Sequence, residues 1–363
     1  MMKLAKLDIQ AVRVPLQKPI PSGRMTIYSA DALLVSLITN DGLVGEGMVF
    51  VLNGYRLAIL RETILSLEPL LTGMDLEMGG AIWAKMWSDI GFLGHRGLAT
   101  VAMSAIDMAL WDLRGKKAGL NVSRLLGSCR EHMPIYRSGG LRLSQSIDEL
   151  QAEASDILGQ GFKALKMSLG NASIQEDVKR VRAVREVLGY HIALMSDCNQ
   201  SFSVNQAIRL GRELEEYQLA WIEEPIPYHN HAGEAAIALA LDTPIASGEN
   251  EFTRLGMMEM LRQGSADILM PDLQRMGGPT ELIKVAHAAE LMNISVAPHL
   301  FSEMSLALGA AMPNAIYVEY MPWFSPLYTE SLELDQAGNV PVSSKPGWGF
   351  SFSQEAIAKY KYE

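Results

Sequence analysis

Three acidic residues recur at a fixed interval, each at the end of a short apolar run. Asp197 ends the run IALMSD, Glu223 lies in LAWIEEP and Glu249 in TPIASGEN, and both intervals are 26 residues. This is about the length of one strand–helix unit of a parallel barrel, in which functional residues stand at the C-terminal ends of the strands. Three carboxylates presented on one face predict a site for a hard divalent cation such as Mg²⁺.

From about Pro134 onward, short apolar runs alternate with amphipathic helical segments. Examples of the helical segments are SIQEDVKRVRAVREVLG and VNQAIRLGRELEEY. Buried-type runs separated by helices favour a (β/α) barrel over an open sheet. The segment before the last run is brief and predicts a short helix. The eight runs are MPIYRSGG, FKALKMSLG, HIALMSDCN, LAWIEEP, TPIASGEN, ADILMPD, ISVAPHL and AIYVEYM.

The first third of the chain follows a different pattern. Residues 1 to about 55 alternate with period two, and Asn40-Asp41-Gly42 is a strong signal for a hairpin turn. Residues 18–29 (KPIPSGRMTIYS) are rich in Pro, Gly and Ser and predict a flexible loop. Helical spacing follows from about residue 55 to 126, with Gly119 as a plausible helix end. The expected domains are an α+β domain over 1–130, a barrel over 131–339, and a segment, 340–363, that returns to the first domain.

Composition and charge exclude several classes of function. The 363 residues carry a formal net charge of −10, which argues against a nucleic-acid-binding protein with its basic face. No apolar stretch is long enough to span a membrane, and the N-terminal segment alternates like a strand, so neither a membrane protein nor an exported one is predicted. The two cysteines, Cys129 and Cys198, do not form a disulfide framework, and we expect both to be reduced thiols in a cytoplasmic protein.

Polar residues end each predicted barrel strand from the second onward. Because the C-terminal ends of the strands form one mouth, a ring of this kind is typical of a barrel active site. Any single acid could instead cap the next helix, and a lone histidine at a strand end is more often structural. His229 and His231 lack two further zinc ligands, so we interpret them as loop histidines. The residues at the strand ends are Lys166, Asp197, Asn199, Glu223, Glu224, Glu249, Asn250, Asp272, His299 and Glu319.

These residue types predict chemistry next to a carboxylate group. A Mg²⁺ ion held by the three acids can bind a substrate carboxylate and stabilise the charge that develops when the α-carbon loses its proton. His299 is the candidate base, since imidazole titrates near neutrality, and Asp272 could fix its tautomer. Lys166 would favour an anionic substrate. Glu319 could donate a hydrogen bond to the substrate carboxylate if its pKa is raised.

Eight motifs follow one another between residues 105 and 320: AIDMALWDLRGK, GFKALKMS, SDCNQSF, WIEEP, GEN, MPDLQRMGG, APHLFSE and YVEY. With them, the sequence resembles the enolase superfamily, mandelate racemase subgroup. The resemblance implies a capping α+β domain over a (β/α)7β barrel of the TIM type. It implies one Mg²⁺ per subunit, held by Asp197, Glu223 and Glu249, and a base dyad of His299 and Asp272. A symmetric homo-oligomer, often an octamer, is also implied.

The resemblance further implies that Glu319 donates a hydrogen bond to the enolate and that Asn199 lies near the substrate. Residues 18–29 and 50–56 would close over the site. One position departs from the family pattern, since the second strand usually carries Lys-x-Lys and here reads Lys166-Met167-Ser168. A serine hydroxyl is a poor base without an activating partner, which does not favour racemisation by two bases.

We therefore favour a Mg²⁺-dependent dehydratase of a hydroxylated or sugar acid. His299 would remove the α-proton to give a metal-stabilised enediolate, and would return the proton to the leaving hydroxyl group. One alternative is a racemase or epimerase of a 2-substituted carboxylate with Lys166 as the second base. Another is an inactive barrel that binds an acidic metabolite. The expected partner is a small-molecule carboxylate, and the candidate substrate contacts are Asn199, Ser168, Arg24, Tyr28, Tyr55 and Arg137.

Overall fold

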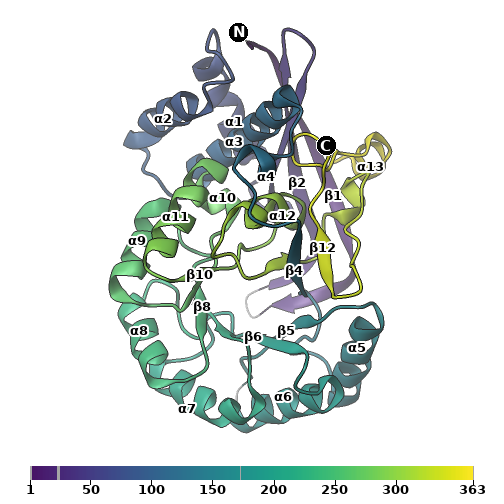
Figure 1. Ribbon diagram of the computed structural model, residues 1–363, viewed down its shortest axis with the longest axis vertical. Helices are drawn as coiled ribbons and strands as arrows, with labels where there is room; N and C mark the ends of the chain where they lie inside the picture. The colour runs from purple at the N-terminus through teal and green to yellow at the C-terminus, as the bar shows by residue number, and fades with distance from the viewer. Residues whose placement is uncertain (1, 23–24, 172, 363) are drawn as a thin grey trace.

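A ring of parallel strands forms the larger part of the structure (Figure 1). The computed structural model describes residues 2–22, 25–171 and 173–362. The strands lie in the order β10-β9-β8-β7-β6-β5-β4-β11, and a parallel bridge between Val296 and Ala315 joins β10 to the segment before β11. The strands are β4 (His132–Arg137), β5 (Ala164–Ser168), β6 (Ala193–Asp197), β7 (Ile222–Glu223), β8 (Ile245–Ser247), β9 (Ile268–Leu269), β10 (Ser295–Val296) and β11 (Val318–Tyr320).

Helices follow every strand of the ring except the last, and they surround it (Figure 1). The predicted (β/α)7β barrel is therefore confirmed. Each of the eight apolar runs contains one of its strands, and the helix before β11 is short, as expected. The helices are α5 (Ile147–Gly159), α6 (Ile174–Leu188), α7 (Val204–Leu214), α8 (His231–Ala240), α9 (Thr253–Gln263), α10 (Leu273–Met276), α11 (Pro279–Leu291) and α12 (Ser302–Ala311), with the 3-10 helix η2 (Glu215–Tyr217).

Side chains fill the interior of the barrel, so that it is a packed core. Tyr136 and Trp221 meet there edge to face, with ring centroids 5.2 Å apart. Because strand side chains alternate, the residues two positions further along face the mouth on the same side. Lys166, Asp197, Glu223 and Glu319 follow interior residues in this way, which is why these polar groups gather. The interior cluster is Tyr136, Ala164, Met195, Trp221, Ala246, Ile268, Met270 and Ala297.

An antiparallel sheet, in the order β1-β2-β3, packs with the long helix α3 beside the barrel. Gly45 and Gly47 of β3 permit this packing, since a Cβ atom at either position would lie 2.3 Å from a carbonyl oxygen of α3. The turn at Asn40–Gly42 and the helix end at Gly119 (φ +66°) lie where the sequence predicts them. The elements are β1 (Leu4–Ser22), β2 (Met25–Thr39), β3 (Val44–Leu52), α1 (Leu57–Leu71), α2 (Gly79–Asp89), η1 (Ile90–Phe92), α3 (Leu98–Ala118) and α4 (Val122–Leu125).

The prediction of a loop over residues 18–29 is wrong. Residues 18–22 and 25–29 continue β1 and β2, and Ile20 pairs with Ile27 and Pro21 with Thr26. The register shifts between Pro15 and Ile20, so the proline-rich stretch is accommodated as a bulged extension of the hairpin. Gly23 and Arg24, the latter a predicted substrate contact, lie outside the described residues.

The C-terminal segment contacts both parts of the molecule. The strand β12 (Asn339–Pro341) pairs antiparallel with β4. Further on, Trp348 donates its backbone N–H to Asp112 of α3 at 2.9 Å. The helix α13 (Gln354–Tyr360) packs against β1, and Tyr362 donates its backbone N–H to Ala11 at 2.9 Å.

The domain boundaries drawn from the sequence stay a prediction. No helix among the described residues has both the length and the hydropathy to span a bilayer.

A buried aspartate fastens α3 to the barrel. Asp107 accepts hydrogen bonds from the backbone N–H and the hydroxyl of Thr280, both at 2.8 Å, and so caps the start of α11 from another element. Gly278, at the N-cap position, has φ +101°, and a Cβ atom there would lie 2.5 Å from the Asp107 carboxyl. Burial raises the pKa of Asp107 to about 7, against these hydrogen bonds.

We expect Asp107→Ala to lower the free energy of unfolding by about 2 kcal/mol, since it leaves two donors of half-buried Thr280 at a helix start without their partner. Urea unfolding followed by circular dichroism measures this. Asp148→Ala is the matched control, because Asp148 is an exposed acid in the first turn of α5. Equal midpoints for the two variants would contradict the capping role.

Candidate active site

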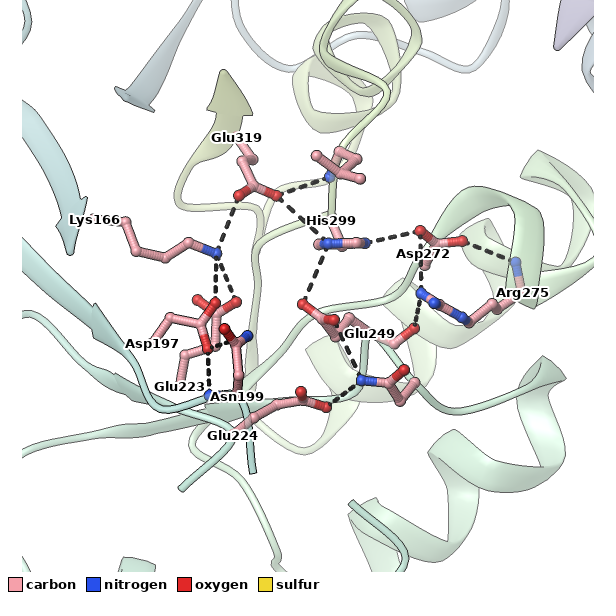
Figure 2. Close-up of polar contacts among 12 residues, drawn as sticks. Lys166, Asp197, Asn199, Glu223, Glu224, Glu249, Asp272, Arg275, His299 and Glu319 are labelled. Atoms are coloured by element: carbon pink, nitrogen blue, oxygen red, sulfur yellow. Dashed lines mark hydrogen bonds and ion pairs between the residues drawn. The ribbon is translucent and has the colours of Figure 1, made fainter. Parts of the chain in front are cut away.

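Acidic and basic side chains from neighbouring strands gather at the C-terminal mouth of the barrel (Figure 2). The register places Ser168 beside Asp197 and Asp197 beside Glu223. The structure thus brings together the residues predicted at the ends of β5, β6, β7 and β11 and those that follow β8, β9 and β10. Glu223 and Glu319 are fully buried, whereas Asn199 is exposed, so the cluster opens to solvent near Asn199.

Lys166 is the cation at the centre of the acidic residues. Its Nζ lies 2.7 Å from Glu223 Oε1, 3.0 Å from Glu319 Oε1 and 3.6 Å from Asp197 Oδ2. Burial lowers the pKa of Lys166, but the charges of Glu223 and Glu319 outweigh it and raise this pKa well above its usual value. Lys166 therefore remains an ammonium group among these carboxylates.

His299 and Asp272 form the predicted pair. The His299 Nδ1 atom lies 2.8 Å from Asp272 Oδ2, and a parallel bridge joins the backbones of the two residues. Asp272 also caps α10, because its Oδ1 accepts the backbone N–H of Arg275 at 2.9 Å. The other histidine nitrogen, Nε2, faces Glu249 Oε2 at 3.2 Å and Glu319 Oε2 at 3.9 Å. Asp272 thus fixes the ring so that Nε2 points into the cluster (Figure 2).

The backbone at several strand ends is left-handed. Non-glycine residues with positive φ just after strands of the ring include Asn199 (41°), Gln200 (63°), Glu224 (40°) and Leu300 (52°). Such conformations cost about 1–3 kcal/mol each and persist where the surrounding structure determines them. They turn Asn199 back onto Asp197, whose Oδ1 accepts both the backbone and the side-chain N–H of Asn199 at 2.8 Å.

The carboxylates outnumber the cations, and their pKa values reflect this. Desolvation raises the pKa of Asp197 and of Glu223, and only Lys166 opposes it strongly. Desolvation and the charge of Glu249 raise the pKa of Glu224 to about 8. A further positive charge at the mouth would reduce the electrostatic repulsion among these carboxylates.

A hydrogen bond donated by Glu319 would need a raised pKa, and in this structure the pKa of Glu319 is lowered instead. Burial raises this pKa, but the charges of Lys166 and His299, with hydrogen bonds from Ser138 and the Leu300 N–H, lower it to about 2. Glu319 is therefore a carboxylate that accepts the Leu300 N–H at 3.0 Å. The donor role of Glu319 stays a prediction.

The predicted metal ligands are adjacent but do not enclose a metal centre. Within residues 2–22, 25–171 and 173–362, no three histidine, cysteine or acidic side chains converge as a formed metal site. Oxygens of Asp197 and Glu223 approach Lys166 instead, and one oxygen of Glu249 approaches His299. The donor set still fits Mg²⁺, because carboxylate oxygens from three neighbouring strand ends with surplus negative charge suit a hard cation.

The residues predicted to contact the substrate do not all lie at the mouth of the barrel. Ser168 lies on the same face of β5 as Lys166, at the mouth. Tyr28 and Tyr55 are 61% and 54% exposed on the N-terminal sheet and the turn after it. Arg137 is not in the cluster, because alternation along β4 turns Tyr136 inward and Arg137 outward, where its guanidinium lies 5.7 Å from the Tyr320 ring.

Several polar residues of the site were not singled out from the sequence. Arg275 lies 3.6 Å from Asp272 Oδ2 and donates to the backbone oxygen of Glu249 at 2.8 Å, which links the dyad to the acidic residues. Trp221 donates its indole N–H to Glu223 Oε2 at 3.1 Å. The i, i+2 spacing of Trp221 and Glu223 on one strand is a signal that could have shown this contact.

Family comparisons agree with this architecture. Residues 5–127 match the model of the mandelate racemase/muconate lactonizing enzyme N-terminal domain, and residues 149–356 match the enolase C-terminal domain-like model. The chain belongs to the mandelate racemase/muconate lactonizing enzyme group of the enolase superfamily. The resemblance seen in the motifs is confirmed.

Similar proteins in this family act on sugar acids. The chain is 34% identical to L-talarate/galactarate dehydratase of Salmonella typhimurium, over 94% of this chain and 87% of that protein. It is 33% identical to 3,6-anhydro-alpha-L-galactonate cycloisomerase of Streptomyces coelicolor, over 97% and 99% of the two chains. The crystal structure of L-talarate dehydratase from Polaromonas, complexed with Mg and L-glucarate, superimposes with a TM-score of 0.92 at 33% identity, covering 100% of this chain and 98% of that one.

The electrostatics of His299 lead to a prediction about Mg²⁺. Burial lowers the pKa of this imidazole, but the charge of Glu249, followed by the hydrogen bond of Asp272, raises it to about 9. The negative charge of Glu249 is the largest of the effects that raise the His299 pKa. Because a cation bound to Glu249 would neutralise this charge, we expect saturating Mg²⁺ to lower the His299 pKa. The imidazole NMR signal, followed against pH with and without Mg²⁺, measures this, with exposed His229 as the control. An unchanged His299 midpoint would show that Mg²⁺ does not bind at Glu249.

Proposed function

We propose that this enzyme is a Mg²⁺-dependent dehydratase of a sugar acid. The observation that carries the proposal is the His299–Asp272 pair, in which the other ring nitrogen of His299, Nε2, lies 3.2 Å from one of three clustered acidic residues. One positioned base beside a cation site is what removal of a proton next to a carboxylate requires. The sugar-acid dehydratases among its relatives support this class of reaction.

Asp197, Glu223 and Glu249 would hold the Mg²⁺. When bound, the ion supplies electrostatic stabilisation for the negative charge that develops on the substrate carboxylate. Lys166 keeps its ammonium group beside Glu319 and Glu223, where it favours an anionic substrate at the mouth. The burial of Lys166, which is 7% exposed, strengthens this attraction, since water screens it little.

His299 moves the proton. Its Nδ1 is held by Asp272, so Nε2 takes the proton from the α-carbon and the electron pair of that C–H bond forms a carbon–carbon double bond. The C–O bond at the β-carbon breaks, and the leaving hydroxyl takes the proton from Nε2 and departs as water. The enol that remains rearranges to a 2-keto acid. The net change is loss of water, with no oxidation or reduction, and His299 ends in its starting state.

A second candidate is a racemase or epimerase of a 2-substituted carboxylate. Its supporting observation is that Lys166 and His299 approach Glu319 from opposite sides, at 3.0 Å and 3.9 Å (Figure 2). In that reaction each residue serves one enantiomer, so Lys166→Ala and His299→Asn each abolish α-proton exchange of a different enantiomer. Exchange of both enantiomers by Lys166→Ala would remove this candidate.

Proton NMR in D₂O with Mg²⁺ and a set of sugar acids and α-hydroxy acids tests the proposal. Loss of the α-proton signal with formation of a 2-keto acid supports the dehydratase and identifies the substrate. Exchange with appearance of the other epimer and no keto acid supports the second candidate. No exchange with any acid, despite Mg²⁺ binding, would instead indicate a barrel that only binds an acidic metabolite.

A further inference from the structure

Each of the three proposed metal ligands accepts a hydrogen bond from a neutral side-chain N–H group that lies within two residues of it. Asn199 Nδ2 donates to Asp197 Oδ1 at 2.8 Å, and Trp221 Nε1 donates to Glu223 Oε2 at 3.1 Å. Asn250 Nδ2 contacts Glu249 Oε1 at 3.2 Å.

In every case the donor contacts one oxygen and leaves the other facing the cations of the site. Asp197 Oδ2 and Glu223 Oε1 lie 3.6 Å and 2.7 Å from Lys166 Nζ, and Glu249 Oε2 lies 3.2 Å from His299 Nε2. The three carboxyl groups are thus fixed in rotation with one oxygen of each turned into the mouth (Figure 2). Neutral donors do this without cancelling the negative charge that attracts a cation.

We infer that Asn199, Trp221 and Asn250 are positioning residues that set the affinity of the site for a divalent cation. The inference rests on the proposed function, in which Asp197, Glu223 and Glu249 are the ligands. Partners that orient metal ligands typically contribute about 10- to 100-fold in metal affinity.

Packing or a second hydrogen bond holds two of the three donors, Trp221 and Asn250, in place. Trp221 is fully buried, and its ring lies between those of Tyr136 and Tyr317, with centroids 5.2 Å and 5.9 Å away. The Asn250 amide is held by a second contact, to Glu224 Oε1 at 2.7 Å, while Gln200 Nε2 donates to Glu224 Oε2 at 3.0 Å.

Two matched pairs of variants in the full-length protein test the inference. Trp221→Phe removes the donor to Glu223, whereas Tyr317→Phe changes a neighbouring interior ring with no acidic partner among the described residues. Asn250→Ala removes the donors to Glu249 and Glu224, whereas Gln200→Ala removes a donor to Glu224 and the acceptor of the Tyr228 N–H but leaves the contact between Asn250 and Glu249 in place. The affinity for Mg²⁺ alone is measured by isothermal titration calorimetry, and thermal melting in chelator reports on the fold.

We expect Trp221→Phe and Asn250→Ala to weaken Mg²⁺ binding about 10-fold, with the two controls at the wild-type value. Equal Mg²⁺ affinity in wild type and all four variants overturns the inference and leaves the proposed function intact. An equal loss in test and control variants also overturns it, because general loosening of the mouth then explains the effect. Absence of Mg²⁺ binding in the wild type overturns both the proposed function and this inference.

Discussion

Replacement of His299 by asparagine is expected to lower the rate of α-proton exchange by about 10³-fold. Asparagine keeps a polar side chain opposite Asp272 but has no lone pair that can take up a proton near neutral pH, and general base catalysis is typically worth about 10²–10⁴-fold. Exchange in D₂O, followed by proton NMR with the acid that wild-type enzyme turns over, measures the loss.

The control is His229→Asn, since His229 is exposed and lies in the loop after β7. It should exchange at the wild-type rate. Wild-type exchange by His299→Asn would remove His299 as the base and leave the 2.8 Å contact with Asp272 as a structural hydrogen bond.

Removal of the metal has an effect of similar size. Dialysis against EDTA is expected to lower turnover by about 10³-fold, since a bound cation contributes several kcal/mol of transition-state stabilisation and each 1.4 kcal/mol is about tenfold in rate. Addition of Mg²⁺ should restore the rate. Far-UV circular dichroism should not change, because the packing of α3 against the barrel relies on contacts such as Asp107–Thr280 that lie outside the cluster.

Full activity in enzyme shown by elemental analysis to contain no metal would contradict this prediction. It would also leave the repulsion among Asp197, Glu223 and Glu249 without an explanation in function.

The barrel and the main residues of its mouth could be predicted because both depend on local spacing. A buried parallel strand has an apolar run, and the residue that ends the run stands at the mouth whatever the rest of the chain does. Asp197, Glu223 and Glu249 are found from that rule alone. The pairing of His299 with Asp272 follows too, since neighbouring strands bring their ends together, and the structure places them 2.8 Å apart.

The remaining errors arise where distant parts of the chain decide the outcome. Residues 18–29 have the composition of a loop, but pairing of β1 with β2 extends the hairpin through them. The pKa of Glu319 depends on Lys166 and His299, which come from other strands. The position of Arg137 outside the cluster has another cause, since it depends on which residues of β4 face inward, and one buried neighbour, Tyr136, decides that. Its contact with the substrate stays a prediction.

The contact between the two chain ends has a consequence for synthesis on the ribosome. Tyr362 and α13 contact β1, so the free edge of this strand is covered by residues made about 310 positions after the end of β3. At a synthesis rate of about 5–20 residues per second, roughly 15–60 s pass between the synthesis of the N-terminal sheet and that of the residues that cover β1. During this interval the nascent hairpin presents an unprotected strand edge to chaperones and to other nascent chains. We therefore expect C-terminal truncation before α13 to lower the yield of native protein.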